Sequence, residues 1–407
     1  SKQFANHFNE IQKQQELIES IILEEEKSFL RTLQSGIERL DVMTKNSKSK
    51  KLSGKDVFEL FDTYGFPADL TSLILKENKM SFNLNEFEAE LEKQRSRSKK
   101  SSQTVTSDWV ILNDNQSDTF SGYDNLTLKT RVNQYRYVKV KDQEICQLVL
   151  ENTPFYPEGG GQSGDKGKLV FENNNELLII DTKKENGKIL HFSKKPDFDI
   201  SCNVKASVDS FERNECSSNH SSTHLLHQAL RNVLGNHVEQ KGSSVTSEGL
   251  RFDFSHFKKI DDDQIKEIET YVNNRIDDSI ELEENRNENY NTAIDNGAIG
   301  LFGEKYGKTV RTIKFGKSYE LCGGTHVRNT MNIRNFLIIS ESSIASGIRR
   351  IEAISGKKSI NYLSDRNNEI NQLKSILSSN KGTVDSVKNL KNENSELSKT
   401  LKKSQKK

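Results

Sequence analysis

The change in residue pattern near Asp108 places the strongest limit on how this chain can fold. Before it, apolar residues recur at helical spacing, whereas the stretch after it consists of short β-favouring runs separated by turn residues. The runs are WVIL, LTLKTRV, YRYVKV, ICQLVLE, KLVFE, LLIID and KILHF. So many short strands within about a hundred residues indicate a closed barrel or a sandwich. Because helical patterns lie on both sides, we expect a multidomain α+β protein.

The changes of pattern divide the chain into five expected parts. They are helices in 1–45, a small helical unit with a basic linker in 46–105, a β-barrel with a glycine-rich loop in 106–205, an α+β domain in 206–358 and a helical tail in 359–407. The linker sequence KQRSRSKKSSQ is typical of a solvated connection and also allows contact with a phosphate backbone. In the tail, a weak heptad interrupted by Gly382 fits an antiparallel hairpin at least as well as a coiled-coil dimer.

Local signals give the clearest helix boundaries. Ser53 is a candidate N-cap for a helix in GKDVFELFDTY, and the proline in GFPADLTSLILKEN marks a turn before a second helix. Further helices are predicted at 210–234 and 262–278, and strands at LRFDF, VRTIKF and FLIISES. This mixture of elements is the reason for assigning the second half of the chain to the α+β class.

Charge, hydropathy and cysteine content exclude several classes of protein. The 60 basic and 59 acidic residues nearly cancel, so any contact with nucleic acid must come from local patches. No run approaches the roughly 18 apolar residues of a membrane span, and the start of the chain lacks the pattern of a signal peptide. The four cysteines are widely spaced and resemble no disulfide framework, which fits a reducing cytosol.

Three histidines are predicted to share one helical face in NHSSTHLLHQALRNVLG. His220, His224 and His227 fall at positions i, i+4 and i+7, mixed with leucines. Two imidazoles at i and i+4 lie about 6 Å apart along the axis, so that their ring nitrogens can converge on one cation. On this spacing alone, a structural role in the core is the commoner explanation of such a pair.

A second group of metal-type donors lies far downstream in SYELCGGTHV. Cys322 and His326 flank two glycines, which allow the backbone to curl until both side chains face one point. A free cysteine is otherwise often a small buried apolar residue. One thiolate and three imidazoles suit a tetrahedral Zn²⁺ ion, and the four predicted ligands are His220, His224, Cys322 and His326. His227 is expected to pack behind them, although it is also able to replace one of the four.

The third feature is the glycine-rich stretch TPFYPEGGGQSGDKG. Gly159–Gly161 followed by Gln162 are costly in conformational entropy unless a ligand must approach the bare backbone closely. A hairpin with glycine-rich turns is an equally good explanation. The stretch is not a phosphate-binding P-loop, because it lacks the Gly-Lys-Ser/Thr ending that opens a helix.

Several long motifs together resemble the editing region of alanyl-tRNA synthetases, which the free-standing Ala-type trans-editing proteins share. They are NHSSTHLLHQALRNVLGNHVEQKGSSV, LRFDFSH, GLFGEKYG, ELCGGTHV and GIRRIEA, in the order of that family. FYPEGGGQSGDKG resembles the barrel of the same family, while LFDTYGFPADLT and FSGYDNL resemble its linker region. Residues 10–44 resemble the last helices of its tRNA-recognition region. The likeness covers nearly the whole chain.

The resemblance implies a zinc-binding editing domain at 206–358 that hydrolyses mischarged Ser-tRNA(Ala) and Gly-tRNA(Ala), with one Zn²⁺ per chain. The family pattern places Gln240 in the substrate pocket, and Thr325 is a second candidate catalytic residue from its position beside a ligand. Gly159, Gly160, Gly161 and Gln162 are expected to shape the pocket. The implied partner is the acceptor end of tRNA(Ala), without DNA or a membrane. The alternative function is a non-catalytic, zinc-stabilised tRNA-binding module.

The need for such a site is physical. A pocket for alanine cannot exclude glycine by size and rejects serine weakly, whereas a second site built to bind a hydroxyl can discriminate strongly. Four protein ligands make a closed zinc site, while catalytic zinc keeps one position open. Either the ion expands to five ligands, or one ligand is not permanent, or the metal only positions the substrate.

The sequence also departs from the full enzyme of the family. That enzyme begins with a class II synthetase domain, which binds ATP and alanine, and this sequence has no such segment. We therefore expect a fragment or a split-gene product without alanine–tRNA ligase activity of its own, with the missing catalytic half as a possible partner. Its expected location is the cytoplasm, with an organelle as the alternative.

Contacts with tRNA phosphates are expected from local basic residues. The candidates are Arg95, Arg97, Lys99 and Lys100 in the linker, and Arg349–Arg350. The arginine pair suits carboxylate partners within the fold equally well. The charged residues of LRFDFSH are Arg251, Asp253 and His256. They belong either to a strand with satisfied charges or to one that lines the site.

Overall fold

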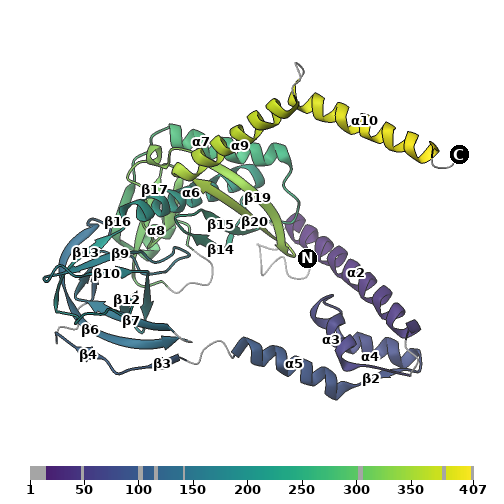
Figure 1. The fold of residues 1–407 in the computed structure, drawn as a ribbon, viewed down its shortest axis with the longest axis horizontal. Coiled ribbons are helices and arrows are strands. Elements are labelled where there is room, and N and C mark those ends of the chain that lie inside the picture. Colours follow the sequence, from purple (N-terminus) through teal and green to yellow (C-terminus); the bar gives the residue numbers. More distant parts are fainter. Residues whose placement is uncertain are drawn as a thin grey trace.

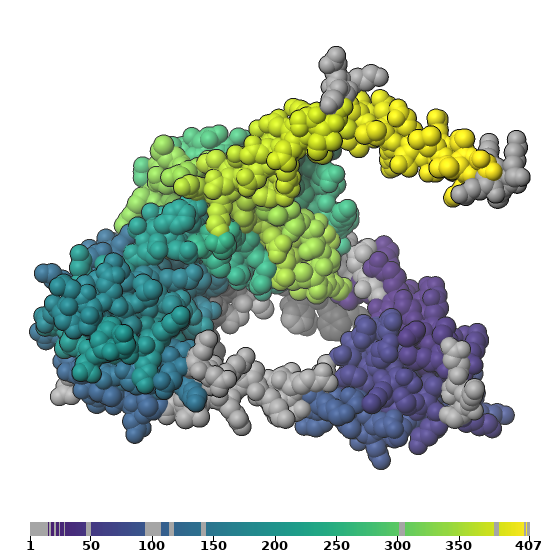
Figure 2. All heavy atoms as spheres, in the orientation of Figure 1, coloured from purple at the N-terminus to yellow at the C-terminus, as the bar shows by residue number. Residues whose placement is uncertain are grey.

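A computed structural model of the 407-residue chain describes residues 15–46, 50–99, 104–113, 118–140, 143–300, 306–377 and 382–404. It is a multidomain α+β protein, as predicted, and its parts follow one another along the chain (Figure 1). We call them the helical unit (15–99), the β unit (104–208), the α+β unit (210–355) and the helical arm (356–404). Figure 2 shows the β unit packed directly against the α+β unit.

The helical unit contains four helices and one short parallel strand pair among its described residues. The elements are α2 (Gln15–Asn46), β1 (Lys51–Leu52), α3 (Gly54–Asp62), α4 (Ala68–Glu77), β2 (Ser81–Phe82) and α5 (Leu84–Lys99). The predicted cap is confirmed, because Ser53 Oγ accepts a hydrogen bond from the Asp56 N–H at 3.2 Å. Phe66 is fully buried at the centre of this unit, and its ring packs so closely on Gly36 that no side chain fits there.

The β unit is built on a nine-stranded sheet. Its strands are β3 (Thr104–Thr106), β4 (Val110–Ile111), β6 (Thr127–Val140), β7 (Gln143–Leu150), β9 (Gly167–Phe171), β10 (Glu176–Ile179), β11 (Asp181–Glu185), β12 (Lys188–Lys194) and β13 (Asn203–Val208). The main order is β10-β9-β13-β6-β7-β12-β11, all antiparallel, and β3 and β4 also pair with β6. A separate parallel pair joins β5 (Thr119–Phe120) to β8 (Asn152–Thr153).

The prediction of a closed barrel for 106–205 is wrong, because the sheet is open. The two ends of its main strand order, β10 and β11, are successive pieces of one chain segment that bends at Ile180. The first piece pairs with β9 and the second with β12, and the Ile180 N–H donates to Phe192 O at 2.8 Å. No ladder joins β10 to β11 in the described part of the unit. The sheet instead curls over one apolar core that includes Leu148, Phe155 and Leu169.

The α+β unit combines two antiparallel sheets with a long buried helix. Its strands are β14 (Gln240–Val245), β15 (Leu250–Ser255), β16 (Glu283–Asn289), β17 (Thr309–Phe315), β18 (Ser318–Leu321), β19 (Phe336–Ala345) and β20 (Ile348–Ser355). The sheet orders are β14-β15-β20-β19 and β16-β17-β18. The helices are α6 (Ser210–Leu234), α7 (Asp262–Asp277), α8 (Tyr290–Asp295) and the 3-10 helix η1 (Thr330–Ile333).

Helix α6 runs through the centre of the α+β unit, and its predicted bounds, 210–234, are confirmed. The Asp209 side chain caps its first turn by accepting hydrogen bonds from the N–H groups of Phe211 and Glu212. One side of the helix contributes Leu225, Leu226 and Leu230 to a core shared with β15 and α7. The helix is therefore held rigidly, and it presents its polar residues in fixed positions.

The helical arm consists of α9 (Gly356–Leu377) and α10 (Thr383–Ser404). Figure 1 shows α10 continuing away from α9, so the arm is extended and does not form the antiparallel hairpin. Apolar side chains such as Ile376 and Leu397 are 76% and 64% exposed along it. Across the described ranges, we find no helix with the length and apolar composition that a membrane crossing requires.

Candidate metal centre

Four donor side chains from two distant segments meet in the α+β unit. His220 and His224 lie one turn apart on α6, and Cys322 and His326 lie on the loop that follows β18. Their ligand atoms all lie within 4.8 Å of one another. These four residues, here called the four-donor cluster, are the ones predicted from the two motifs. The fold thus brings together segments about a hundred residues apart in the chain.

The thiol of Cys322 lies at the centre of this cluster. Its Sγ atom is 3.4 Å from His220 Nε2 and 3.3 Å from His326 Nε2. The Gly324 N–H points at the same sulfur at 3.3 Å. The His220 ring packs directly on Gly324, where an added Cβ would lie 2.0 Å from the His220 Cε1 atom. The glycine is therefore required by close approach, since its φ is not in the left-handed region.

The outer nitrogens of two rings are held by polar side chains. His220 Nδ1 lies 2.7 Å from Gln162 Oε1, and His326 Nδ1 lies 3.1 Å from Ser221 Oγ. The same Gln162 oxygen accepts the Thr325 N–H at 2.8 Å, which fixes it as the acceptor end of the amide. His220 must then carry its proton on Nδ1, and the Nε2 lone pair faces the thiol. A buried nitrogen of His224, Nδ1, has no hydrogen-bond partner.

Burial keeps the imidazoles of the cluster neutral. Removal from water, followed by repulsion from neighbouring rings, holds the pKa of His220 and of His326 well below the ordinary value. Burial likewise lowers the pKa of His224. Neutral imidazoles and a thiol are the donors that a borderline-soft divalent ion selects. The residues present therefore fit a metal ion such as zinc.

Sequence reasoning missed a carboxylate beside the cluster. The Glu320 side chain lies between two histidines, with Oε2 3.7 Å from His224 Nε2 and Oε1 3.0 Å from His227 Nδ1. His227 lies outside the four-donor cluster, and its ring packs against Phe252. The signal for Glu320 in the sequence was its place as the first residue of ELCGGTHV, two residues before Cys322, which does not show where the side chain points.

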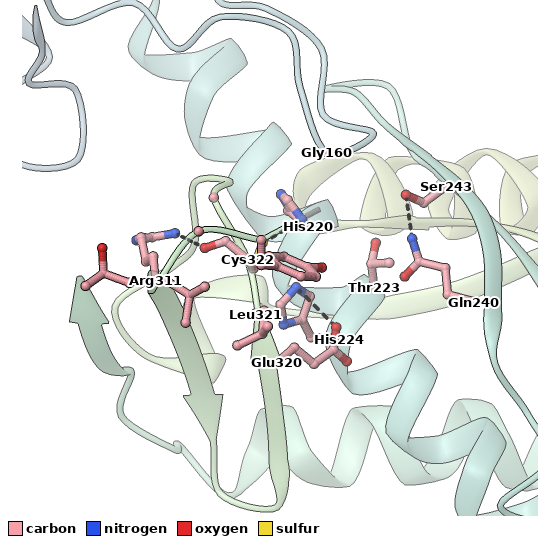
Figure 3. A pocket seen from close by; sticks show the side chains of 15 residues that line it. Gly160, His220, Thr223, His224, Gln240, Ser243, Arg311, Glu320, Leu321 and Cys322 are labelled. Carbon is pink, nitrogen blue, oxygen red and sulfur yellow. Dashed lines mark hydrogen bonds and ion pairs between the residues drawn. The ribbon is translucent and has the colours of Figure 1, made fainter. Parts of the chain in front are cut away.

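A cavity of about 270 Å³ opens beside the cluster (Figure 3). His220, His224 and Cys322 form part of its wall. Further lining residues are Gly160, Thr223, Gln240 and Ser243, and Figure 3 shows Gln240 and Ser243 on the side away from Cys322. Thr223 was not predicted, although it lies on the same turn of α6 as His220 and His224. The cavity therefore combines metal-type donors with neutral hydroxyl and amide groups.

The glycine-rich loop reaches this cavity through a tight turn. Gly159 and Gln162 exchange two backbone hydrogen bonds of 3.1 and 3.0 Å, and Gly160 and Gly161 between them have φ values of 58° and 81°. Positive φ at both central positions is the geometry that favours glycine in two-residue turns. A Cβ on Gly161 would lie 2.3 Å from Ser243 Oγ, whereas Gly160 has open space in front of it.

Of the predicted site residues, Gly160 and Gln240 line this cavity, whereas Gly159, Gly161, Gln162 and Thr325 do not. Gln162 is fully buried, and its Nε2 donates to Thr325 Oγ1 at 3.0 Å. Thr325 Oγ1 is also 2.8 Å from Ser217 Oγ, and Thr325 lines a second cavity of about 510 Å³. Both side chains therefore support the cluster from outside, and Gln162 does so directly through His220.

The predicted basic contacts have mixed outcomes. Arg350 pairs with Asp253 at 2.7 and 2.8 Å, and Arg349 pairs with Glu341, so both arginines hold strands together. His256 Nδ1 lies 2.9 Å from His237 Nε2. Arg251 is 39% exposed and lines a third cavity, of about 620 Å³, next to Gly161. The side chains of the four linker candidates, Arg95, Arg97, Lys99 and Lys100, lie outside the described residues.

Arg213 joins the β unit to the first turn of α6. It forms a buried ion pair with Asp165, and its Nη1 and Nη2 groups donate to Gly122 O and Pro154 O at 2.6 and 2.9 Å. Every one of these partners belongs to the β unit. Breaking one half of a buried pair is strongly destabilising, so the contact fixes the β unit relative to the cluster helix.

Comparisons with known proteins cover both halves of the chain. A family model described as tRNA synthetases class II (A) matches residues 1–212. A model described as the threonyl and alanyl tRNA synthetase second additional domain matches residues 310–352, which include Cys322 and His326. The match to the second model therefore contains half of the four-donor cluster.

Similar full-length proteins are named as alanine–tRNA ligases. The chain is 49% identical to that of Christiangramia forsetii over 402 residues, which is 98% of this chain and 46% of that protein. It is 46% identical to that of Flavobacterium psychrophilum over 410 residues, 98% of this chain and 46% of the relative. For Bacteroides fragilis the identity is 46% over 397 residues, 97% and 45% of the two chains. The chain spans about half the length of these curated relatives.

Proposed function

Because this chain belongs to the alanyl-tRNA synthetase family, we propose that its four-donor cluster is the zinc centre of an aminoacyl-tRNA editing site. The site hydrolyses Ser-tRNA(Ala) and Gly-tRNA(Ala) and spares Ala-tRNA(Ala). The observation that carries this proposal is the meeting of one thiol and three imidazoles within 4.8 Å, beside a cavity with hydroxyl and amide walls. One zinc ion per chain is expected.

Discrimination between serine and alanine requires groups that pair with the serine hydroxyl. The Thr223 hydroxyl donates its proton to Asn219 O at 2.9 Å, so its lone pairs remain available to accept. Gln240 Nε2 donates to Ser243 Oγ at 3.0 Å and holds its amide at the cavity wall. We assign recognition of the serine hydroxyl to Thr223 and Gln240. An alanine methyl leaves these polar groups unpaired, which can reduce binding by a factor of about 10⁴. These contacts account for serine alone, and the hydrolysis of Gly-tRNA(Ala) is proposed from the family resemblance.

The remaining residues orient the reacting ester. When bound, zinc supplies a Lewis acid that polarises an oxygen at the reacting centre. Gly160 has no side chain in front of it and lets the terminal ribose approach the main chain. Gln162 and Ser221 hold the rings of His220 and His326 in position, so their role is to orient donors rather than to touch substrate. Thr325 belongs to the same supporting group.

The proposal is tested by incubating the purified chain with Ser-tRNA(Ala), Gly-tRNA(Ala) and Ala-tRNA(Ala) and measuring release of the labelled amino acid. Zinc content is measured on the same sample and should be about one per chain. Serine and glycine should be released much faster than alanine. The variant Thr223→Val, which removes only the hydroxyl, should reduce the preference for serine over alanine. Binding of tRNA without release would instead indicate a non-catalytic tRNA-binding module.

A further inference from the structure

Three successive carbonyl groups in the cluster loop accept hydrogen bonds from two side chains. Arg311 Nη1 donates to Cys322 O at 2.8 Å and to Gly324 O at 2.7 Å. Between them, Gly323 O accepts the hydroxyl proton of Tyr123 at 2.6 Å. Arg311 belongs to β17 of the same unit, whereas Tyr123 belongs to the β unit, 200 residues earlier in the chain. The loop that carries two metal-type donors is therefore held from both units.

The peptide geometry connects Tyr123 to the thiol. A trans peptide is planar, and its C=O and N–H groups point in opposite directions. Fixing the carbonyl of Gly323 therefore fixes the direction of the Gly324 N–H, which lies 3.3 Å from Cys322 Sγ. In the next peptide, Arg311 fixes Gly324 O, and the Thr325 N–H points to Gln162 Oε1 at 2.8 Å. That oxygen in turn holds His220.

The Tyr123 ring is itself fixed in place. The guanidinium of Arg311 lies 4.0 Å from the ring centre and that of Arg286 lies 5.1 Å from it. Phe120 packs edge-on at 4.8 Å. Asp124, the residue after Tyr123, accepts two hydrogen bonds from Arg286, at 2.6 and 2.8 Å. A ring held on several sides loses little further freedom when its hydroxyl binds Gly323 O, so the contact is preorganised.

The place of Tyr123 depends on how the β unit packs. The preceding residue, Gly122, lies so close to Pro154 that an added Cβ would be 2.1 Å from its carbonyl oxygen. The Gly122 carbonyl accepts Arg213 Nη1 from α6 at 2.6 Å. The segment that carries Tyr123 is thus fixed between the β unit and the helix that bears His220 and His224.

We propose that Tyr123 is a positioning residue for the metal-ligating thiolate of Cys322. It orients the Gly323–Gly324 peptide so that the Gly324 N–H bonds to the sulfur, and the metal centre is complete only when the β unit supplies this hydroxyl. This inference rests on the proposed metal centre. It assigns to the β unit a part in metal binding, although the β unit supplies none of the proposed ligands.

The test compares metal binding by the wild-type chain and by the variants Tyr123→Phe and Tyr123→Leu. Cobalt(II) is titrated into the metal-free protein, and its visible and near-ultraviolet absorption reports tetrahedral coordination by a thiolate. Tyr123→Phe keeps the ring and its arginine neighbours but removes the hydroxyl, so affinity should fall about tenfold, the usual effect of losing an outer-shell hydrogen bond. Tyr123→Leu should lose more, and the sulfur-to-cobalt band should change in both variants.

The control is Tyr137→Phe, which alters a β-unit tyrosine whose ring also faces a cation, at 5.0 Å from Lys195. It should bind cobalt like the wild type. If Tyr123→Phe shows the wild-type affinity and spectrum, the ring merely fills space and the inference is overturned while the metal centre stands. If the wild-type chain itself takes up neither cobalt nor zinc, the proposed centre fails and the inference fails with it.

Discussion

The β unit and the α+β unit both bury histidine, but they use its nitrogens differently. His191 in the β unit is fully buried, and both of its ring nitrogens have protein partners. Nε2 lies 2.7 Å from Thr153 Oγ1 and Nδ1 lies 3.1 Å from Leu148 O. In the four-donor cluster, by contrast, His220 and His326 each give one nitrogen to a protein partner and turn the other toward Cys322. Burial is common to both, so burial alone does not identify a metal ligand.

A third arrangement sharpens this comparison. His237 and His256 stack with ring centres 5.2 Å apart, and a nitrogen of each lies 2.9 Å from the other. The pair satisfies itself through that contact, and it is only partly buried. What distinguishes the four-donor cluster is the convergence of imidazole nitrogens on a thiol, rather than the proximity of imidazoles.

The largest effect is expected from removing the thiol. Cys322→Ala deletes the one soft donor, so zinc affinity should fall on the order of a thousandfold, and the purified protein should lose its metal. Zinc content after dialysis against a chelator measures this. The matched control is Cys202→Ala, which removes a partly exposed thiol of the β unit and should leave zinc content unchanged. Full zinc content in Cys322→Ala would show that the four-donor cluster does not hold the metal through its thiol. The contrast between the histidines of the two units would then fail.

The next effect concerns acid stability of the β unit. Burial lowers the pKa of His191 to about 4, against 6.5 for the unperturbed group. Between these values the unfolded chain binds a proton that the folded chain does not, so the free energy of unfolding decreases as pH falls from 6.5 to about 4. The total loss is about 3 kcal/mol. Urea unfolding of zinc-loaded protein at several pH values, followed by the single tryptophan, Trp109, measures it.

His191→Gln supplies the control for that measurement, because it removes the titrating group. The variant should be less stable near neutral pH but should lose less of its stability on acidification. An unchanged pH dependence in the variant would show that His191 is not the group responsible.

A smaller effect is expected at the glycine beneath His220. Gly324→Ala places a Cβ where the His220 ring packs, so the ring or the loop must shift, at a cost of about 1–3 kcal/mol in stability. Zinc affinity should fall as well, because the displaced ring is one of the four proposed zinc ligands. Gly323→Ala is the matched control, since a Cβ there meets nothing within 4 Å. Equal zinc affinity and stability in the two variants would contradict the packing argument.

The smallest effect is expected at His237 and His256, whose ring nitrogens contact each other. His256→Ala removes one partly exposed hydrogen bond, which contributes about 0.5–1.5 kcal/mol to stability. Zinc content should not change, because neither ring of this pair belongs to the four-donor cluster. Loss of zinc in this variant would show that the His237–His256 pair also takes part in metal binding, which contradicts the distinction drawn between this pair and the four-donor cluster.

Local sequence signals predicted the elements that depend on local chemistry. Helix α6 lies at its predicted bounds and Ser53 acts as the expected cap, whereas the capping side chain of Asp209 was not predicted. The structure also brings the four predicted donors together. They could be picked out from the sequence because histidine and cysteine are rare in this chain and each pair of donors is closely spaced. These are patterns within a few turns of helix or a single loop.

Features set by distant contacts were not predictable. The closed barrel was wrong because short β runs reveal strands but not the bend at Ile180 that separates β10 from β11. Tyr123 and Glu320 both lie in motifs that the sequence shows, FSGYDNL and ELCGGTHV, but they reach the donors only through the tertiary fold, and neither motif shows what these side chains contact. Gln162 was expected at the pocket but is buried behind His220, since a glycine-rich stretch does not show which way the next side chain points.

The bend at Ile180 also makes it harder for a strand from a neighbouring molecule to pair with the ends of the nine-stranded sheet. The two terminal strands contain only four and five residues, and the second carries Lys183, Lys184 and Glu185. A foreign strand would find too short a row of free amide and carbonyl groups to dock, and charged side chains beside it. In concentrated solution, these two strands should therefore resist pairing with a neighbouring molecule even though the isolated segments favour extended conformations.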